Sequence, residues 1–445
     1  MEVTRQLAET CSNMQYSDLP HPVTHQVKRC VIDWLGVGLA AAGHETTEIL
    51  RSHVLQMGGA PQATIVGSGD RVSVEQAALV NGTMSHVHDY DDTHLTTVIH
   101  PSSPIIGAAT ALAEWRNTPG QQWILAIAVG MEAALRIGLS VYPSHYDRGW
   151  HITGTAGVLG AAVAGCKIEG LKDDRMATAM GIAATQSSGL REFFGTMTKP
   201  YLPGHAASNG VRAALLAGAG FSSSLRALEA PRGWASVLSP CHDLEVITRD
   251  WSPSYEILNV GIKPYPSGVV THPGIDGALD LKEKYNPDPK RIESVELQVH
   301  PLVLELTGKT EPRTGLEGKF SIYHCVASAL TYGKVGLDEF TDETVRDPQV
   351  VNLRKKIRAE SSSELMPEEA QVTIHMSDGT DHCLHIAHAR GSVQNPITDE
   401  DLEAKFRMLV APVLGQERAE SLLSQCWDLE NSGAKQILTG SIIRN

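Results

Sequence analysis

The sequence predicts a mainly helical protein: a large all-helical domain and a second, smaller α+β domain. Three observations support this fold class. Apolar residues recur at three- and four-residue spacing through the first 250 residues, as in amphipathic helices. After about Trp251, Pro and Gly become frequent and alternating stretches typical of strands appear. The length of 445 residues exceeds one ordinary domain, and an apolar content of 42% suffices for a large core.

The helical part begins near Asp18, where a Leu-Pro pair precedes an apolar stripe that includes Val27, Val31 and Trp34. Several later segments are rich in Ala and Gly on every face, which is typical of helices buried inside a bundle. We expect these helices over Val74–His88, Pro104–Trp115, Gln121–Ser140, Thr155–Cys166, Asp174–Ser187 and Ala206–Phe221. One short strand is expected within Ala60–Gly67.

The α+β part is marked by alternating stretches. Arg291–His300 alternates like a strand, and Gln371–His375 and Cys383–Ala389 flank an Asp-Gly-Thr turn typical of a hairpin. Helices are expected at Gly274–Tyr285, Ser321–Tyr332 and Asp347–Ala359. From Thr398 the pattern is helical again, and we expect this tail to pack back on the first domain. The predicted domains are therefore residues 1–260 together with 397–445, and residues 261–396.

Charge and cysteine content narrow the partners and the compartment. The formal net charge is −14, which disfavours nucleic acids and anionic membranes as partners. Seven scattered cysteines without a C-x-x-C motif predict reduced thiols, and therefore a cytoplasmic protein. The polar N-terminus resembles no secretory signal, and the longest apolar stretches are too short to span a bilayer.

The densest polar cluster is SHVHDYDDTHLTTVIHP, at the end of a predicted helix. It holds His86, His88, Asp89, Asp91, Asp92, Thr93, His94 and His100. Three interpretations compete: a metal site, caps for a helix beginning near Ser102, and a metal-free acid–base and substrate-binding site. The spacing matches no familiar ligand set such as H-E-x-x-H, so we favour the third interpretation and expect no metal.

A second cluster, SHYDRGWHITGTAG, carries Tyr146 and His151 directly before a Gly/Ala helix. Thr153 or Thr155 is expected to cap that helix, whose N-terminus would offer amide groups to a carboxylate. Tyr146 and Trp150 are equally compatible with a role as core aromatics.

A third segment, GTMTKPYLPGHAASNG, carries Lys199 before Pro200, which predicts extended backbone at the lysine. In a segment poor in other charges, a lysine can have a lowered pKa and act as a base. A surface lysine is the alternative. Two further motifs decide nothing alone; they carry Lys263, Tyr265 and His272, and Lys319, Ser321, Tyr323 and His324. Nucleotide chemistry and serine hydrolysis are disfavoured, since G-x-G-x-x-G after a strand, Walker and G-x-S-x-G motifs are all missing.

Taken in order, six segments resemble the MmgE/PrpD family. They are NGTMSHVHDYDDTH, IHPSSPIIGAATALAE, GWHITGTAGVLGAA, GTMTKP with GHAASNGVRAALLA, IKPYPSGVVTHPGIDGA and GKFSIYHCVASALTYGKVGLDEFTDE. The resemblance implies a helical domain and a smaller α+β domain with the active site between them. It also implies a homodimer and no metal or organic cofactor.

The resemblance also implies site residues, which are Asp89, Thr93, His100, His151, Lys199, His272 and Tyr323. One departure concerns Ser267, Gly268 and Val269, where members often carry bulkier residues or Cys. This departure bears on the identity of the substrate more than on the type of reaction.

The family includes 2-methylcitrate dehydratase, cis-aconitate decarboxylase and iminodisuccinate epimerase, which all act beside a carboxylate of a small polycarboxylate. Such chemistry needs proton-transferring groups and stabilisation of developing charge. We predict an iminodisuccinate epimerase in which Lys199 and Tyr146 are opposed proton-transferring groups. His100, His151 and the helix N-terminus near Thr155 would stabilise charge. The dehydratase, the decarboxylase, a catalytically silent scaffold-like relative and a metal-dependent hydrolase are the alternatives.

Overall fold

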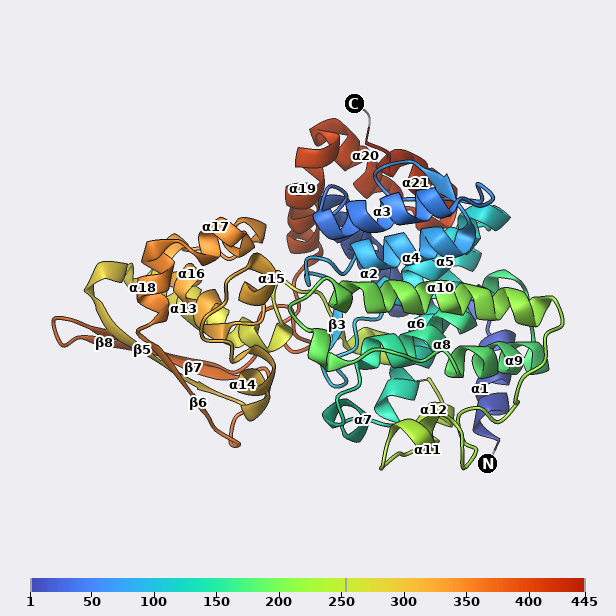
Figure 1. The fold of residues 1–445 in the computed structure, drawn as a ribbon, viewed down its shortest axis with the longest axis horizontal. Helices are drawn as coiled ribbons and strands as arrows, with labels where there is room; N and C mark the ends of the chain where they lie inside the picture. Colours follow the sequence, from blue (N-terminus) through green and yellow to red (C-terminus); the bar gives the residue numbers. More distant parts are fainter. Residues whose placement is uncertain (1, 253, 444–445) are drawn as a thin grey trace.

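The computed structural model describes residues 2–252 and 254–443 and confirms the predicted fold class. Figure 1 shows a large block of helices and, beside it, a smaller lobe in which helices cover a twisted sheet. The first block takes its core from the first 262 residues and from the last helices. The smaller lobe has a separate core that runs from Tyr265 to Met376.

The first part of the helical domain contains twelve helices within the described residues. They are α1 Val3–Asn13, α2 His21–Ala40, α3 Glu45–Met57, α4 Val74–Met84, α5 Ser102–Arg116, α6 Gly120–Leu139, α7 Ser144–Asp147, α8 Ile152–Ile168, α9 Asp173–Ala184, α10 Thr198–Gly218, α11 Trp234–Leu238 and α12 Glu245–Thr248. Two short antiparallel pairs accompany them, β1 Ala63–Thr64 with β2 Arg71–Val72 and β3 Thr93–His94 with β4 Val260–Gly261.

Small residues let the central helices α4, α8 and α10 approach closely. A Cβ on Gly204 of α10 would lie 2.3 Å from the carbonyl oxygen of Leu79 on α4. A Cβ on Gly210 would lie 2.4 Å from the Ala161 side chain on α8. The Ala/Gly-rich texture of these segments therefore reflects helix contacts that larger side chains would prevent.

The chain returns to the helical domain at its end, through α19 Asp399–Leu414, α20 Gln416–Trp427 and α21 Leu429–Ser441. Thr398 begins α19 with a capping box in which its hydroxyl accepts from the Asp401 amide. Helix α19 packs on α2, and α21 packs on α6 and α5. In Figure 1 these red helices lie against the blue N-terminal ones.

The α+β domain contains a four-stranded sheet in the order β6-β5-β7-β8. Its strands are β5 Ile292–Val299, β6 Ile357–Ser361, β7 Ala370–Met376 and β8 Asp381–Ile386, and only the β5–β6 pair is parallel. Its helices are α13 His272–Tyr285, α14 Pro301–Thr307, α15 Gly315–Gly318, α16 Ile322–Tyr332, α17 Asp342–Val345 and α18 Pro348–Arg354. Helix α13 packs on β7 and β8, and α16 contacts β6.

The structure corrects two local predictions. The helix expected over Asp347–Ala359 ends at Arg354. Residues 357–359, which were expected to belong to this helix, lie in strand β6, because Ile357 pairs with Val295 of β5. Lys199 lies in the first turn of α10 and not in extended backbone. Pro200 is accommodated there because amides in the first turn of a helix have no intrahelical acceptor.

Helix α6 is the one helix in the described ranges that is long and apolar enough to cross a membrane. However, 89% of the residues in its most apolar stretch are buried inside the protein, as in a core helix.

Candidate active site

A narrow cavity lies where the helical domain meets the α+β domain. The helical domain contributes Asp89, Val98, His100, Tyr146, His151, Phe194 and Lys199 to its walls. The segment after β4 and the α+β domain contribute Lys263, Gly268, Val269, Val270, Leu306, Thr307 and Phe320. Its volume is about 40 Å³, room for about three water molecules. A polycarboxylate would therefore enter only if the walls move.

Asp89 holds two lysine ammonium groups at the polar end of this cavity. Its Oδ1 lies 2.7 Å from Lys263 Nζ and 3.2 Å from Lys199 Nζ. All three side chains are buried. Asp89 has a backbone φ of 50°, a left-handed conformation that few non-glycine residues adopt. Lys263 also donates to the Asp89 carbonyl at 3.0 Å, so the same ammonium group supports both the backbone and the carboxylate.

Burial and the neighbouring charges shift the pKa values of this group in opposite directions. Burial alone would raise the pKa of Asp89, but Lys199 and Lys263 hold it well below its ordinary value. Burial lowers the pKa of Lys199, and Asp89 opposes this effect. With one carboxylate and two amines, the cluster has a net positive charge whenever both lysines are protonated. Such a site attracts a carboxylate ligand.

A chain of hydrogen bonds through His86 and Asp91 positions Lys199. His86 Nδ1 lies 2.9 and 2.8 Å from the two carboxylate oxygens of Asp91. Because an ionised carboxylate only accepts, Nδ1 carries the proton, and Nε2 is left to accept from Lys199 Nζ at 2.9 Å. Ser103 donates to the same Asp91 carboxylate at 2.8 Å. The amine of Lys199 is therefore fixed by Asp89 and His86.

His100 and His151 line the cavity as neutral imidazoles. Burial, reinforced by Lys263 for His100 and by Lys199 for His151, lowers the pKa of each well below its ordinary value. His100 Nδ1 lies 2.9 Å from the Asp92 carbonyl and 3.1 Å from the Thr93 hydroxyl. His151 Nδ1 is buried and has no partner among the described residues.

Tyr146 lines the same cavity from α7. Burial raises the pKa of its hydroxyl, and the nearby Arg191, whose guanidinium carbon lies 4.0 Å from the ring centre, opposes this only in part. The phenol therefore keeps its proton at neutral pH. It is better suited to donate a proton than to remove one.

The remaining wall of the cavity is apolar. Phe194 of the helical domain and Phe320 of the α+β domain have ring centres 5.6 Å apart. Lys199 Nζ lies 5.4 Å from each of these ring centres. Val98, Val269, Val270 and Leu306 complete this side. The cavity thus has a cationic end and an apolar side.

The structure places four other predicted site residues around or away from the cavity. Thr93 supports His100, and Thr93 and His272 both line a second small cavity, which shares Lys263 with the first. Thr155 lies in the first turn of α8, where its hydroxyl hydrogen-bonds His145 Nε2 at 2.7 Å and does not line the cavity. The N-cap of α8 is His151, not a threonine. Tyr323 packs against the core of the α+β domain, while Phe320, three residues earlier, reaches the cavity.

Two residues of this cluster were not assigned roles from the sequence. Lys263 lies in the IKPYPSG motif, and His86 lies in the His/Asp-rich segment. In the sequence, Lys263 is marked only by its place among apolar residues and prolines. It lies 174 positions from Asp89, so the sequence gives no sign of their contact. Their roles depend on tertiary contacts.

The cluster His86, Asp89, Asp91 and His100 places potential metal-ligand atoms within 4.8 Å of one another. The donor set fits a cation poorly. Both nitrogens of His86 are already engaged, and two ammonium groups lie on Asp89. A divalent ion would meet strong repulsion from Lys199 and Lys263. Both lysines lie on Asp89 Oδ1, so a cation at that oxygen would have to displace an ammonium group.

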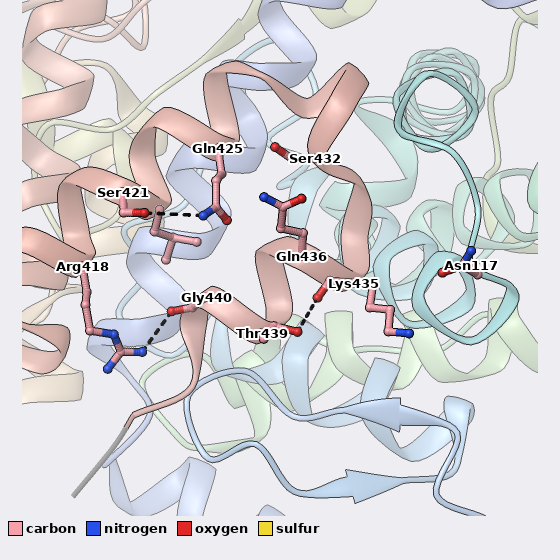
Figure 2. Close-up of a pocket in the computed structure, with 10 residues that line it drawn as sticks. Asn117, Arg418, Ser421, Gln425, Ser432, Lys435, Gln436, Thr439 and Gly440 are labelled. Carbon is pink, nitrogen blue, oxygen red and sulfur yellow. Dashed lines mark hydrogen bonds between the residues drawn. The ribbon is translucent and has the colours of Figure 1, made fainter.

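A wider hollow of about 570 Å³ lies elsewhere, at the surface between α20, α21 and Asn117 (Figure 2). Arg418 borders it and donates to the Gly440 carbonyl at 3.1 Å. Its lining includes none of the predicted site residues. The narrow interdomain cavity is the better candidate, because it brings together buried cations, imidazoles and a phenol.

Comparison with known proteins places the chain in one family. The MmgE/PrpD N-terminal domain matches residues 5–247, and the MmgE/PrpD C-terminal domain matches residues 265–429. The chain is 26% identical to a cis-aconitate decarboxylase of Mus musculus, over 98% of this chain and 92% of that protein. It is 25% identical to a cis-aconitate decarboxylase-like protein of Aspergillus oryzae, over 97% and 95%. It is also 26% identical to a 2-methylcitrate dehydratase of Salmonella typhimurium, over 74% and 71%. The two domain matches together cover most of the sequence, and the chain belongs to the MmgE/PrpD family.

Proposed function

We propose that this protein is a lyase that releases carbon dioxide from a small unsaturated polycarboxylate of the cis-aconitate type. The observation that carries the proposal is the cavity with a cationic end, formed by Lys199 and Lys263 on Asp89, and an apolar side. Two relatives named for cis-aconitate decarboxylation align over nearly the whole chain, whereas the dehydratase aligns over 74% of it.

The cationic end and the apolar side of the cavity suit the charge movement of decarboxylation. The carboxylate that leaves becomes neutral carbon dioxide, and an apolar wall disfavours its charged form relative to the product. The electron pair of the broken C–C bond passes into the remaining carbon skeleton and onto a neighbouring carboxylate. Lys199 and Lys263 are placed to stabilise the charge that develops there.

The reaction then needs one proton at carbon. Tyr146, Lys199 and Lys263 are the cavity groups that hold a transferable proton, while His100 and His151 are neutral hydrogen-bonding groups. A raised pKa makes the Tyr146 phenol a proton donor to a strongly basic carbanion. The donor regains its proton from solvent after the product leaves.

The same observations favour the lyase over the epimerase that we predicted from the sequence. Epimerisation needs one group that removes a proton and an opposed group that returns one. Tyr146 with a raised pKa is a poor base, and the relatives compared here are named as decarboxylases and dehydratases.

The first experiment follows the purified protein by proton NMR in D₂O with cis-aconitate, 2-methylcitrate and iminodisuccinate in separate tubes. We expect cis-aconitate to lose one carboxylate and to gain one deuteron at carbon. Dehydration of 2-methylcitrate, or inversion of iminodisuccinate with an intact skeleton, would replace the decarboxylase proposal by the corresponding activity. No change in any tube would contradict the proposal.

Replacing Tyr146 by phenylalanine tests the proton donor. We expect kcat to fall by about 100-fold or more, because a positioned acid contributes about 10²–10⁴-fold. KM should change little, since the ring remains and the cations are untouched. The measurement is the steady-state rate of carbon dioxide release. The matched control is Tyr142→Phe, which removes a neighbouring phenol whose ring centre lies 6.1 Å from that of Tyr146. Wild-type kcat in Tyr146→Phe would assign the proton to one of the two lysines, Lys199 or Lys263.

A further inference from the structure

Three buried lysines hold one short segment of the helical domain through its backbone. Residues 88–90, which include Asp89, present three consecutive carbonyl groups, and each accepts from a different ammonium group. The bonds are Lys319 Nζ to His88 O at 2.8 Å, Lys263 Nζ to Asp89 O at 3.0 Å, and Lys405 Nζ to Tyr90 O at 2.7 Å.

Each of these lysines also donates to the segment 263–267, which leads into the α+β domain. Lys319 reaches the Pro266 carbonyl at 2.9 Å, Lys263 the Ser267 carbonyl at 3.2 Å, and Lys405 the Lys263 carbonyl at 2.8 Å. The Tyr90 hydroxyl adds a bond to the Pro264 carbonyl at 2.9 Å. The two segments that carry Asp89 and Lys263 are therefore tied together by side chains, and we call this arrangement the lysine ladder.

Lys319 differs from the other two lysines of the ladder in its charge balance. Lys263 pairs with Asp89, and Lys405 pairs with Asp33 at 2.6 Å. Lys319 is 4% exposed and has no carboxylate within 4 Å among the described residues. Its ammonium group is bound by two carbonyl groups and lies 4.8 Å from the Phe340 ring centre. The hydrogen-bond partners of this buried cation are the carbonyl groups of the two segments that it joins.

We propose that Lys319 is a positioning residue for the reaction. Its ammonium group belongs to the α+β domain and donates a hydrogen bond to the His88 carbonyl of the helical domain. This bond holds Asp89, the next residue, in place beside Lys199 and Lys263. The next residue, Phe320, lines the cavity, and the Lys319 carbonyl accepts from the Gly268 amide at 3.0 Å. One residue thus ties the Asp89 segment to two parts of the opposite wall. The inference about kinetics rests on the proposed function, while the inference about the resting structure does not.

The protonation state of Lys319 matters, because its charged ammonium form makes stronger hydrogen bonds to the two carbonyl groups than the neutral amine would. Burial lowers its pKa to about 7, and Asp89 opposes this. The charged and titratable groups that act on its charge or line the adjoining hollow are His44, Glu45, His88, Asp89, Lys199, Lys263, His324, Cys325, Asp338 and Asp342. The ladder should therefore weaken as pH rises through about 7.

The test compares Lys319→Met and Lys319→Arg with the wild-type protein, and it uses Lys167→Met as a matched control. Lys167 also donates to two carbonyl groups, of Ser12 at 2.8 Å and Met14 at 2.6 Å, but it lies outside the cavity. In the protein without substrate, we expect Lys319→Met to speed amide hydrogen exchange over residues 85–92 by about ten-fold. The thermal midpoint should change little, because removing a buried charge offsets the lost hydrogen bonds.

Kinetics give the second readout. Since a displacement of about 1 Å can cost about 100-fold in rate, we expect Lys319→Met to lower kcat by that order with KM changed less than about three-fold. Lys319→Arg should retain activity and shift the alkaline limb of the kcat/KM profile to higher pH, because a guanidinium stays charged. Lys167→Met should match the wild type in both measurements.

Three results would overturn the inference. Unchanged exchange over residues 85–92 in Lys319→Met would show that the segment does not depend on Lys319. Wild-type kcat in Lys319→Met, or an unshifted alkaline limb in Lys319→Arg, would show that its ammonium form does not position the site. If no polycarboxylate is turned over by the wild type, the proposed function fails, but the exchange experiment still decides the structural inference.

Discussion

Replacing Lys199 by methionine should lower kcat by about 1000-fold or more. Methionine keeps most of the volume of the side chain, so α10 and the adjacent aromatic wall should remain in place. The change removes a positive charge that lies 3.2 Å from Asp89 Oδ1 and within 5.4 Å of two cavity ring centres. Stabilisation of developing charge is lost, which alone costs about 100- to 1000-fold, and one of the proton-bearing groups of the cavity is lost with it. The rate is measured as carbon dioxide release under saturating substrate.

His86→Asn tests how Lys199 is positioned. It removes the imidazole that accepts from Nζ at 2.9 Å but leaves the lysine itself in place. We expect a smaller loss of kcat than in Lys199→Met, because Asp89 still holds the ammonium group. Equal activity of Lys199→Met and the wild type would contradict the proposed site.

Replacing Asp89 by asparagine should destabilise the fold by about 3–5 kcal/mol, because removing one partner of a buried ion pair leaves an uncompensated buried charge. Here one carboxylate is shared by Lys199 and Lys263. The stabilisation exists above the ordinary carboxyl pKa and is lost as pH falls through the lower pKa of the folded state. Urea unfolding at pH 7 measures the difference, and kcat should fall with it.

Asp92→Asn is the matched control, since it changes a second buried carboxyl three positions further on. Asp92 accepts from the Ser102 hydroxyl at 2.6 Å and has no ammonium partner among the described residues. Burial raises the pKa of this carboxyl to about 8, so at pH 7 it is largely protonated and an amide resembles it. The free energy of unfolding should therefore change much less than in Asp89→Asn. Equal losses in the two variants would contradict a special role of the shared ion pair.

The periodicity of the sequence predicted most helices and the hairpin, because amphipathic spacing and turn residues are local signals. The periodicity gave wrong predictions where contacts between distant segments determine the local structure. Residues 357–359 continue a helical pattern but become strand β6, since β5 offers an open parallel edge. Lys199 enters a helix despite Pro200, since the first turn tolerates a missing amide hydrogen.

The candidate site was partly predictable from the sequence. Motif resemblance indicated Asp89, His100, His151 and Lys199, which the structure brings into one cavity together with Tyr146. It gave no role to Lys263, whose contact with Asp89 joins residues 174 positions apart. The sequence around a single lysine does not indicate which carboxylate it will contact, because the distance between the two groups is determined only when the chain folds.

The return of the chain to its first domain has a consequence for synthesis on the ribosome. Helix α19 fills a place beside α2, where Phe406 lies against Gly36, so the core of the N-terminal domain is incomplete until the last fifty or so residues emerge. The α+β domain is continuous in sequence and has a separate core, so it can fold first. At translation rates of about 5–20 residues per second, the nascent helical domain waits roughly ten to forty seconds for its closing helices. During this interval the apolar face of α2 is uncovered, and a chaperone has its main opportunity to bind.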